Sequence, residues 1–199
     1  MLVAMKEIIN PDVIINYDTA QNKLKLKEEG ADSKIAELYI EHMPDNALAF
    51  TLDHQPKRDK QKFKQLSLYV NSANDVGINK GCDLIILWQD AEQKRALVFD
   101  LKSDKPKPQA TKKQLDNSEL FLKYLLNMAS VHYNVNIDGI EIDKAIITTN
   151  ARGARKRATY QPNADIAHTG NYKIESVLAN ASKTASVSFR RLIKGVAHR

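Results

Sequence analysis

The chain has 199 residues, of which 43% are hydrophobic and 27% are charged, and this length and composition fit one globular domain with an ample core. Its one cysteine, Cys82, excludes an internal disulfide framework and favours a reducing cytoplasm. No apolar stretch approaches the roughly 18 residues of a membrane span, and the first residues lack the apolar region of a secretory signal. We therefore expect no membrane partner.

The net charge of +6 is unevenly distributed along the chain. Residues 144–199 carry 11 Lys+Arg and 2 Asp+Glu, whereas residues 1–143 carry 19 and 22. The C-terminal quarter is therefore the part that a polyanion would contact. Its densest stretch is ARGARKR, residues 151–157, which a solvated basic loop would also explain.

The first 42 residues contain one ambiguous region and one predicted helix. The apolar VIINY and the Lys/Glu-rich NKLKLKEEG are consistent with either a hairpin or an arm within residues 1–32. Ser33 has the chemistry of a helix N-cap, and the apolar residues after it recur at helical spacing. We therefore predict a short helix over SKIAELYIEH, residues 33–42, with Glu37 and Glu41 on one flank.

Four strands are predicted in the middle of the chain. Residues 47–54, ALAFTLDH, form the first, and residues 65–71, QLSLYVN, alternate apolar and polar side chains as a half-buried strand does. Residues 83–89, DLIILWQ, and 95–102, RALVFDLK, are joined by the polar DAEQK, which predicts a hairpin. Both hairpin strands are apolar enough to be covered on both faces.

A long helix and a further buried strand follow the hairpin. Apolar residues recur from Lys112 to about Tyr133, which predicts the helix, and DKAIITT, residues 143–149, predicts the strand. Residues 176–183 favour a helix, and residues 186–193 fit either a strand or a helix. Strands mixed with helices around one sheet indicate an α/β fold or an α+β sandwich.

Charged side chains lie where the two hairpin strands meet at one edge. Asp83 opens the first strand, and Asp100 and Lys102 end the second. Because strand side chains alternate faces, Asp100 and Lys102 point the same way. Asp83 shares their face only if paired positions sum to an odd number, as they do when Asp83 lies opposite Asp100.

This cluster has two interpretations. In the first, the lysine and the acids neutralise each other as a salt-bridged strand end. In the second, they are half of a metal-dependent hydrolytic site: two carboxylates within roughly 5 Å repel each other, and a divalent cation removes that penalty. Oxygen ligands favour Mg²⁺ or Mn²⁺, and the five histidines show no zinc-binding spacing. The lysine could then position a water in line with a phosphorus atom.

The order of these residues resembles the PD-(D/E)xK nuclease superfamily, which includes many restriction endonucleases and Holliday-junction resolvases. The likeness covers about residues 33–149 and rests on Asp83 followed by Asp100-Leu101-Lys102 in helix-strand-strand-strand-helix-strand order. It implies an α/β restriction-endonuclease-like core, with a central mixed four- to five-stranded sheet flanked by helices. Residues 1–32 would then be an N-terminal arm, and residues 150–199 a basic extension, of a single nuclease-like domain.

The resemblance implies roles for individual residues. Asp83 and Asp100 would be metal ligands and Lys102 the catalytic lysine. The predicted first helix would supply a third acid, Glu37 or, as second choice, Glu41.

A further likeness lies in the helix after the acid-x-lysine stretch. Gln114 corresponds to a glutamine that lies near the active site in some members of the superfamily. Two departures accompany it: Cys82 replaces the proline that names the motif, and Asp100 stands where glutamate is commoner.

The implied function is a Mg²⁺-dependent endonuclease acting on DNA, in a setting of bacterial or phage defence such as restriction. Cutting both strands of a duplex often calls for two active sites, so a homodimer is one expected assembly and a subunit of a larger complex is another. Basic residues near the site would contact phosphates. They are Lys80, Lys112, Lys113, Arg152, Arg155, Lys156 and Arg157.

Two other functions remain open. The first is a nucleic-acid-binding or interaction module that keeps the nuclease fold without catalysis. Intact Asp83, Asp100 and Lys102 argue against it, because a scaffold has no reason to hold three charges at one edge. The second is a secreted toxin domain that uses the same chemistry.

Overall fold

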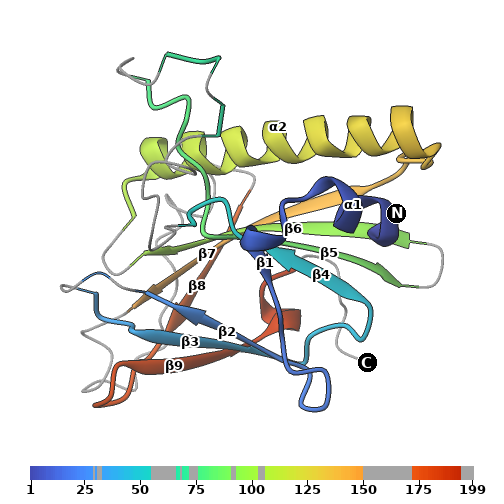
Figure 1. Ribbon diagram of the computed structural model, residues 1–199. Coiled ribbons are helices and arrows are strands. Elements are labelled where there is room, and N and C mark those ends of the chain that lie inside the picture. Colours follow the sequence, from blue (N-terminus) through green and yellow to red (C-terminus); the bar gives the residue numbers. More distant parts are fainter. Residues whose placement is uncertain are drawn as a thin grey trace.

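The computed structural model describes residues 1–28, 30, 33–54, 66–67, 69–71, 76–90, 93–102, 106–149 and 172–193, which form an α/β structure (Figure 1). The elements in chain order are α1 (Leu2–Ile8), η1 (Pro11–Val13), β1 (Ile14–Ile15), β2 (Lys23–Lys27), β3 (Glu37–Glu41), β4 (Ala47–Phe50), β5 (Leu84–Asp90), β6 (Gln93–Lys102), α2 (Pro108–Tyr133), β7 (Glu141–Thr149), β8 (Lys173–Val177), β9 (Thr184–Ser188) and η3 (Phe189–Arg191).

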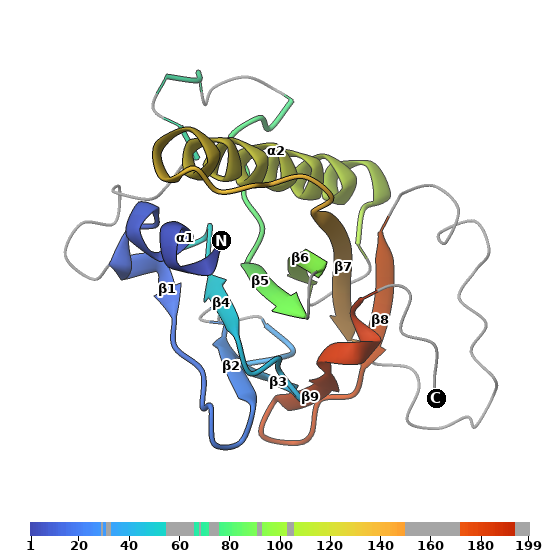
Figure 2. The ribbon, with the colours of Figure 1, turned by 90° about the vertical axis from the view of Figure 1, so that its right-hand side faces the viewer.

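The strands form two sheets. The larger sheet is mixed and has six strands in the order β1-β4-β5-β6-β7-β8, with antiparallel pairing from β1 to β6 and parallel pairing from β6 to β8. The smaller sheet has the order β2-β3-β9. Both helices lie on one side of the larger sheet and the smaller sheet lies on the other, which gives three layers (Figures 1 and 2).

The hairpin strands β5 and β6 are buried on both faces, as their apolar sequences predicted. Ile85 and Val98 face the helices, in a core that includes Leu115 of α2. Ile86 and Leu97 face the smaller sheet. Side chains therefore alternate between two cores along each strand, and the helix-covered face is the one that matters for the charged residues.

The predicted helix over residues 33–42 is wrong, because residues 37–41 form β3. Leu38 and Ile40 are fully buried at a spacing of two, and β3 pairs with β2 on one side and with the distant β9 on the other. Tertiary pairing thus outweighs a helical reading of the same apolar residues. Ser33 caps no helix; its hydroxyl donates to the carbonyl of Ile35.

Other predicted elements differ at the ends of the chain and in one loop. Of residues 66–67 and 69–71, none lies in a strand; Asn79 bridges them instead, by bonding the Ser67 amide and the Val70 carbonyl. The predicted helix over residues 176–183 is wrong, since β8 ends at Val177 and a turn follows. Residues 186–193 continue β9 into η3.

The elements around the hairpin are confirmed. The structure contains β4 within the predicted residues 47–54, the β5–β6 hairpin, and β7 over the predicted residues 143–149. The long helix is also present, although α2 begins at Pro108, where a proline fits the first helical position.

Neither terminal region is a separate arm or extension in its described part. Met5 of α1 and Leu24 of β2 are fully buried, and β8 and β9 each add a strand to a sheet. The larger sheet consequently has more strands than the expected four to five. None of the helices in the described segments is long and apolar enough to cross a membrane.

Candidate active site

The register of the β5–β6 hairpin decides the geometry of the acidic cluster. Leu84 pairs with Phe99 and Ile85 pairs with Val98, so paired positions sum to an odd number. One further step along the ladder sets Asp83 opposite Asp100. Both carboxylates then share the face of Ile85 and Val98, beneath α2. This is the register that the sequence required for a shared site.

Asp83 is tied directly to the neighbouring strand. Its Oδ2 accepts a hydrogen bond from the backbone amide of Leu101 at 2.6 Å. Burial and then the negative charge of Asp100 raise the pKa of Asp83 well above its usual range, and the hydrogen bond from Leu101 and the charge of Lys102 oppose this only in part. Burial also raises the pKa of Asp100, against the opposing charge of Lys102. The two acids therefore compete for one cationic partner.

Lys102 and Gln114 complete the cluster. Lys102 Nζ lies 2.6 Å from Asp100 Oδ2, which is buried and accepts no well-oriented hydrogen bond, so this contact is ionic. Lys102 Nζ also donates to Gln114 Oε1 at 3.0 Å. The Gln114 amide group donates to Asp100 Oδ1 at 3.2 Å and to the carbonyl of Gly81 at 2.5 Å. Gln114 therefore orients the lysine and the acid together.

The donor set fits a hard divalent cation. Asp83 and Asp100 present oxygen atoms on one face, and their two negative charges exceed the single positive charge of Lys102. Mg²⁺ often uses one or two carboxylates and completes its shell with water or phosphate oxygens. Within the described segments no group of three or more His, Cys, Asp and Glu side chains is arranged to hold a metal ion. Among the described residues, Asp83 and Asp100 are the carboxylates that could hold such an ion.

The structure does not bring Glu37 or Glu41 to this cluster. Both lie on β3, whose alternation buries Leu38 and Ile40 and turns the glutamates to the outer face of the smaller sheet. Glu37 Oε1 lies 2.5 Å from Lys25 Nζ, and Glu41 Oε1 lies 3.3 Å from Lys23 Nζ. Hydrogen bonds from Lys25 and Tyr39 lower the pKa of Glu37. The expectation of a third acid at Glu37 or Glu41 is therefore wrong.

Asp53 is an acid near the cluster that the sequence reasoning missed. Phe50 pairs with Ile85 in the β4–β5 ladder, and extending that register brings Leu52 opposite Asp83. A side chain at Gly81 would come within 2.8 Å of Leu52 Cβ, so the two segments pack closely. Burial comes first among the causes that raise the pKa of Asp100, and the charge of Asp53 adds to them. An aspartate near the end of the predicted strand over residues 47–54 was the available signal.

The predicted phosphate contacts are only partly described. Lys80, Lys112 and Lys113 are exposed. Lys112 Nζ pairs with Asp116 Oδ2 at 2.6 Å, and the first turn of α2 contains no acidic residue. Arg152, Arg155, Lys156 and Arg157 lie outside the described residues.

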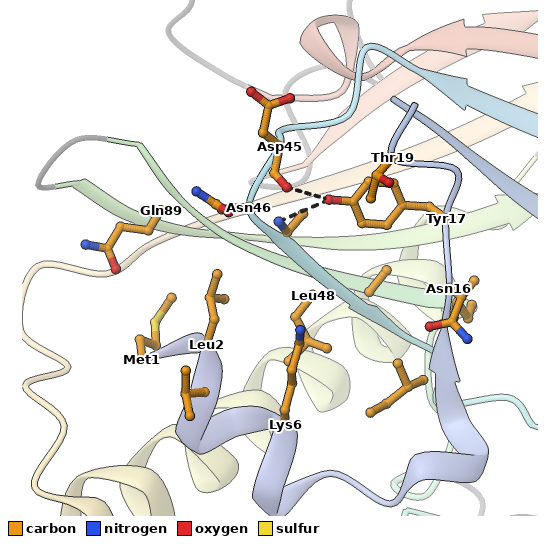
Figure 3. A pocket seen from close by; sticks show the side chains of 15 residues that line it. Met1, Leu2, Lys6, Asn16, Tyr17, Thr19, Asp45, Asn46, Leu48 and Gln89 are labelled. Atoms are coloured by element: carbon orange, nitrogen blue, oxygen red, sulfur yellow. Dashed lines mark hydrogen bonds between the residues drawn. The ribbon is translucent and has the colours of Figure 1, made fainter. Parts of the chain in front are cut away.

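A pocket of about 720 Å³ lies elsewhere, between α1, β1 and β4, and none of the predicted site residues lines it (Figure 3). Leu2 and Leu48 contribute apolar walls. The Tyr17 hydroxyl donates to the carbonyls of Pro44 and Asp45 and accepts from the Ala47 amide, so its polar atom is satisfied. This pocket is therefore separate from the acidic cluster.

Comparisons with family models, curated proteins and solved structures gave no match. The functional assignment consequently rests on the geometry of the cluster.

Proposed function

We propose that the protein is a Mg²⁺- or Mn²⁺-dependent endonuclease that hydrolyses phosphodiester bonds of DNA, with its active site at Asp83, Asp100 and Lys102. The observation that carries this proposal is the odd register of the β5–β6 hairpin, which aligns two carboxylates and an ammonium group on one face of the sheet. A salt-bridged strand end needs only one acid for one lysine. The second acid, Asp83, is half-buried and supports a cation site.

The arrangement of elements supports a restriction-endonuclease-like core. The elements α1, β4, β5, β6, α2 and β7 follow the order helix-strand-strand-strand-helix-strand, with β1, β2 and β3 inserted after α1. In this proposal α1, rather than residues 33–42, is the first helix of the core. The resemblance to PD-(D/E)xK nucleases, with a role in restriction or another form of bacterial or phage defence, then applies to β4 through β7.

Each cluster residue has a distinct task in the proposed reaction. Asp83 and Asp100 would hold the metal ion, which would supply stabilisation of the negative charge that develops on the phosphate. Lys102, whose side chain is 30% exposed, is reached by solvent and orients the attacking water. Gln114 keeps the Lys102 ammonium group in place, because its carbonyl oxygen accepts a hydrogen bond from it.

A polyanionic substrate agrees with the surface near the cluster. Lys80 and Lys113 are exposed on the two segments that flank the acids, and the ARGARKR stretch adds four positive charges further along the chain. Phosphate contacts of this kind supply the sequence-independent part of DNA affinity. Cleavage of both strands would be served by a homodimer or by assembly into a larger complex.

A plasmid-nicking assay tests the proposal. Supercoiled DNA is incubated, with and without Mg²⁺, with four proteins: wild type, Asp100→Ala, Lys102→Ala and the control Asp90→Ala. Asp90 lies at the far end of β5. We expect nicking by wild type and the control only with Mg²⁺, and none by the other two. Metal-independent cleavage, or full activity of Asp100→Ala, would exclude this site.

The same assay separates the enzyme from a nuclease-fold binding module. A module would cleave nothing but would retain DNA in a gel-shift experiment, and this retention would weaken as salt rises. Replacement of Arg155 and Lys156 together by alanine would reduce it further.

A further inference from the structure

One turn of α2 carries polar side chains that bind the segment leading into β5. Ser118 is fully buried, and its hydroxyl accepts a hydrogen bond from the Cys82 amide at 2.8 Å. The same hydroxyl donates to the carbonyl of Gln114 at 2.9 Å, so both of its bonding functions are used. Ser118 lies four positions after Gln114, which places the two residues on one face of the helix. Gln114 binds the Gly81 carbonyl from that face.

Asn117 extends this contact to the earlier part of the segment. Its amide group donates to the carbonyl of Gly77 at 2.9 Å and to that of Lys80 at 3.5 Å. Gly77 has a φ of +72°, a conformation that favours glycine, and the Lys80 amide bonds back to the Gly77 carbonyl at 3.1 Å. Residues 77–82 are thus bound at four backbone positions by a single turn of α2.

We call the contacts from Gln114, Asn117 and Ser118 to residues 77–82 the latch. The latch ends at Cys82, one residue before Asp83. Cys82 is fully buried, so without the Ser118 hydroxyl its amide would lie in the core with no acceptor. Asp83 follows immediately, before the ladder of β5 begins at Leu84. The backbone of Asp83 is therefore fixed on one side by β5 and on the other by the latch.

We propose that Ser118 and Asn117 are positioning residues that set the Asp83 carboxylate opposite Asp100 and thereby raise the affinity of the site for its divalent cation. This inference rests on the proposed function. Residues that orient metal ligands without touching the ion typically change metal affinity by about 10- to 100-fold. A role in folding alone would change stability and leave the affinity of the folded protein as it is.

Calorimetric titration of the full-length chain with MnCl₂ tests the inference. The variants are Ser118→Ala, Asn117→Ala, Ser118→Thr, which keeps the hydroxyl, and the control Asn127→Ala. Asn127 lies on the same helix, and its amide donates to the carbonyl of Lys123 within that helix. We expect Mn²⁺ affinity to fall about tenfold in the two latch variants, to recover in Ser118→Thr and to stay unchanged in the control.

Thermal unfolding without metal shows which variants are folded. If Ser118→Ala is folded and binds Mn²⁺ with wild-type affinity, the positioning role is overturned, while the proposed function stays in place. If Ser118→Ala does not fold, wild-type affinity in Asn117→Ala overturns it. Failure of wild type to bind Mn²⁺ overturns the proposed function and this inference together.

Amide exchange at Leu101 provides a local measurement. This amide donates to Asp83 Oδ2, so its exchange rate reports where the carboxylate lies. We expect faster exchange at Leu101 in Ser118→Ala than in Ser118→Thr. Equal rates in the two variants would contradict the inference.

Discussion

Asp83 Oδ2 and the backbone amide of Leu101 lie 2.6 Å apart, and this hydrogen bond ties the acid before β5 to the strand that carries Asp100 and Lys102. It also holds the two carboxylates side by side, where burial and their mutual repulsion disfavour the doubly charged state. Such an arrangement lowers the stability of the metal-free protein. Destabilised groups of this kind are common at functional sites.

Replacement of Asp83 by asparagine should stabilise the metal-free protein at neutral and alkaline pH. The folded pKa of Asp83 is raised, so its contribution to stability is present below the unfolded pKa and is lost as pH rises through the folded pKa. Asparagine removes the charge and keeps an oxygen to accept from Leu101. We expect urea unfolding at pH 8 to show a gain of about 1 kcal/mol that disappears near pH 4. Equal or lower stability at pH 8 would contradict the repulsion.

Mg²⁺ should stabilise wild type and fail to stabilise the variant. Because a ligand that binds only the folded state adds RT ln(1 + [L]/Kd), a concentration of about 100 Kd adds about 2.7 kcal/mol to the free energy of unfolding. We expect this gain in wild type, its loss on adding EDTA, and no gain in Asp83→Asn or Asp100→Asn. An equal gain in all three proteins would place the ion elsewhere.

Gln114→Ala should slow catalysis more than it weakens DNA binding. The substitution removes the acceptor for Lys102 Nζ and a donor to Asp100, but it removes no charge. We expect a roughly 10- to 100-fold lower rate of nicking, with gel-shift affinity unchanged. Gln109→Ala, an exposed position at the start of the same helix, serves as the control. A parallel loss of binding and rate would assign Gln114 to substrate contact.

The part of the fold that contains the candidate site could be predicted because its signals are local. The strands β5 and β6 are continuous apolar runs separated by a short polar loop, and α2 has a long apolar repeat. Their register could not be predicted, since both parities satisfy the same apolar pattern. Only the hypothesis of a shared site required the odd register, and the structure contains that register.

The residues 33–42 illustrate why the rest was missed. Leu38 and Ile40 fit a period of two, whereas Ile35, Leu38 and Tyr39 also fit a helical period, so the short pattern was ambiguous. What decides is the pairing of β3 with β9, about 147 residues further along the chain. His42 then has a φ of +59°, which ends the strand and would not occur within a helix.

Glu37 and Asp53 should differ in their effect on metal binding. Glu37→Gln should leave Mg²⁺ affinity unchanged, because its carboxylate faces Lys25 on the outer side of the smaller sheet. Asp53→Asn should weaken Mg²⁺ binding about threefold, since one negative charge near Asp100 is worth less than 1 kcal/mol through water. Calorimetric titration measures both. If Glu37→Gln bound Mg²⁺ more weakly than wild type and Asp53→Asn bound it equally well, Glu37 rather than Asp53 would be the acid near the metal ion.

Ion pairs between α2 and β7 hold the helix over the larger sheet. Lys144 of β7, whose side chain is 11% exposed, pairs with Asp116 at 2.6 Å and with Glu119. Burial would raise the pKa of each acid, but hydrogen bonds from lysines outweigh it and both are lowered. These pairs therefore stabilise the fold above the unfolded pKa of the acids, and the contribution is lost as pH falls through the folded pKa.

We expect Lys144→Met to reduce the free energy of unfolding by about 1 kcal/mol at pH 7, after allowing for solvent at Asp116, and to make little difference near pH 2. Lys123→Met, which removes an exposed pair with Glu119 on the same helix, should cost less than about 0.5 kcal/mol. Equal losses in the two variants would mean that the buried position of Lys144 adds nothing to the docking of α2.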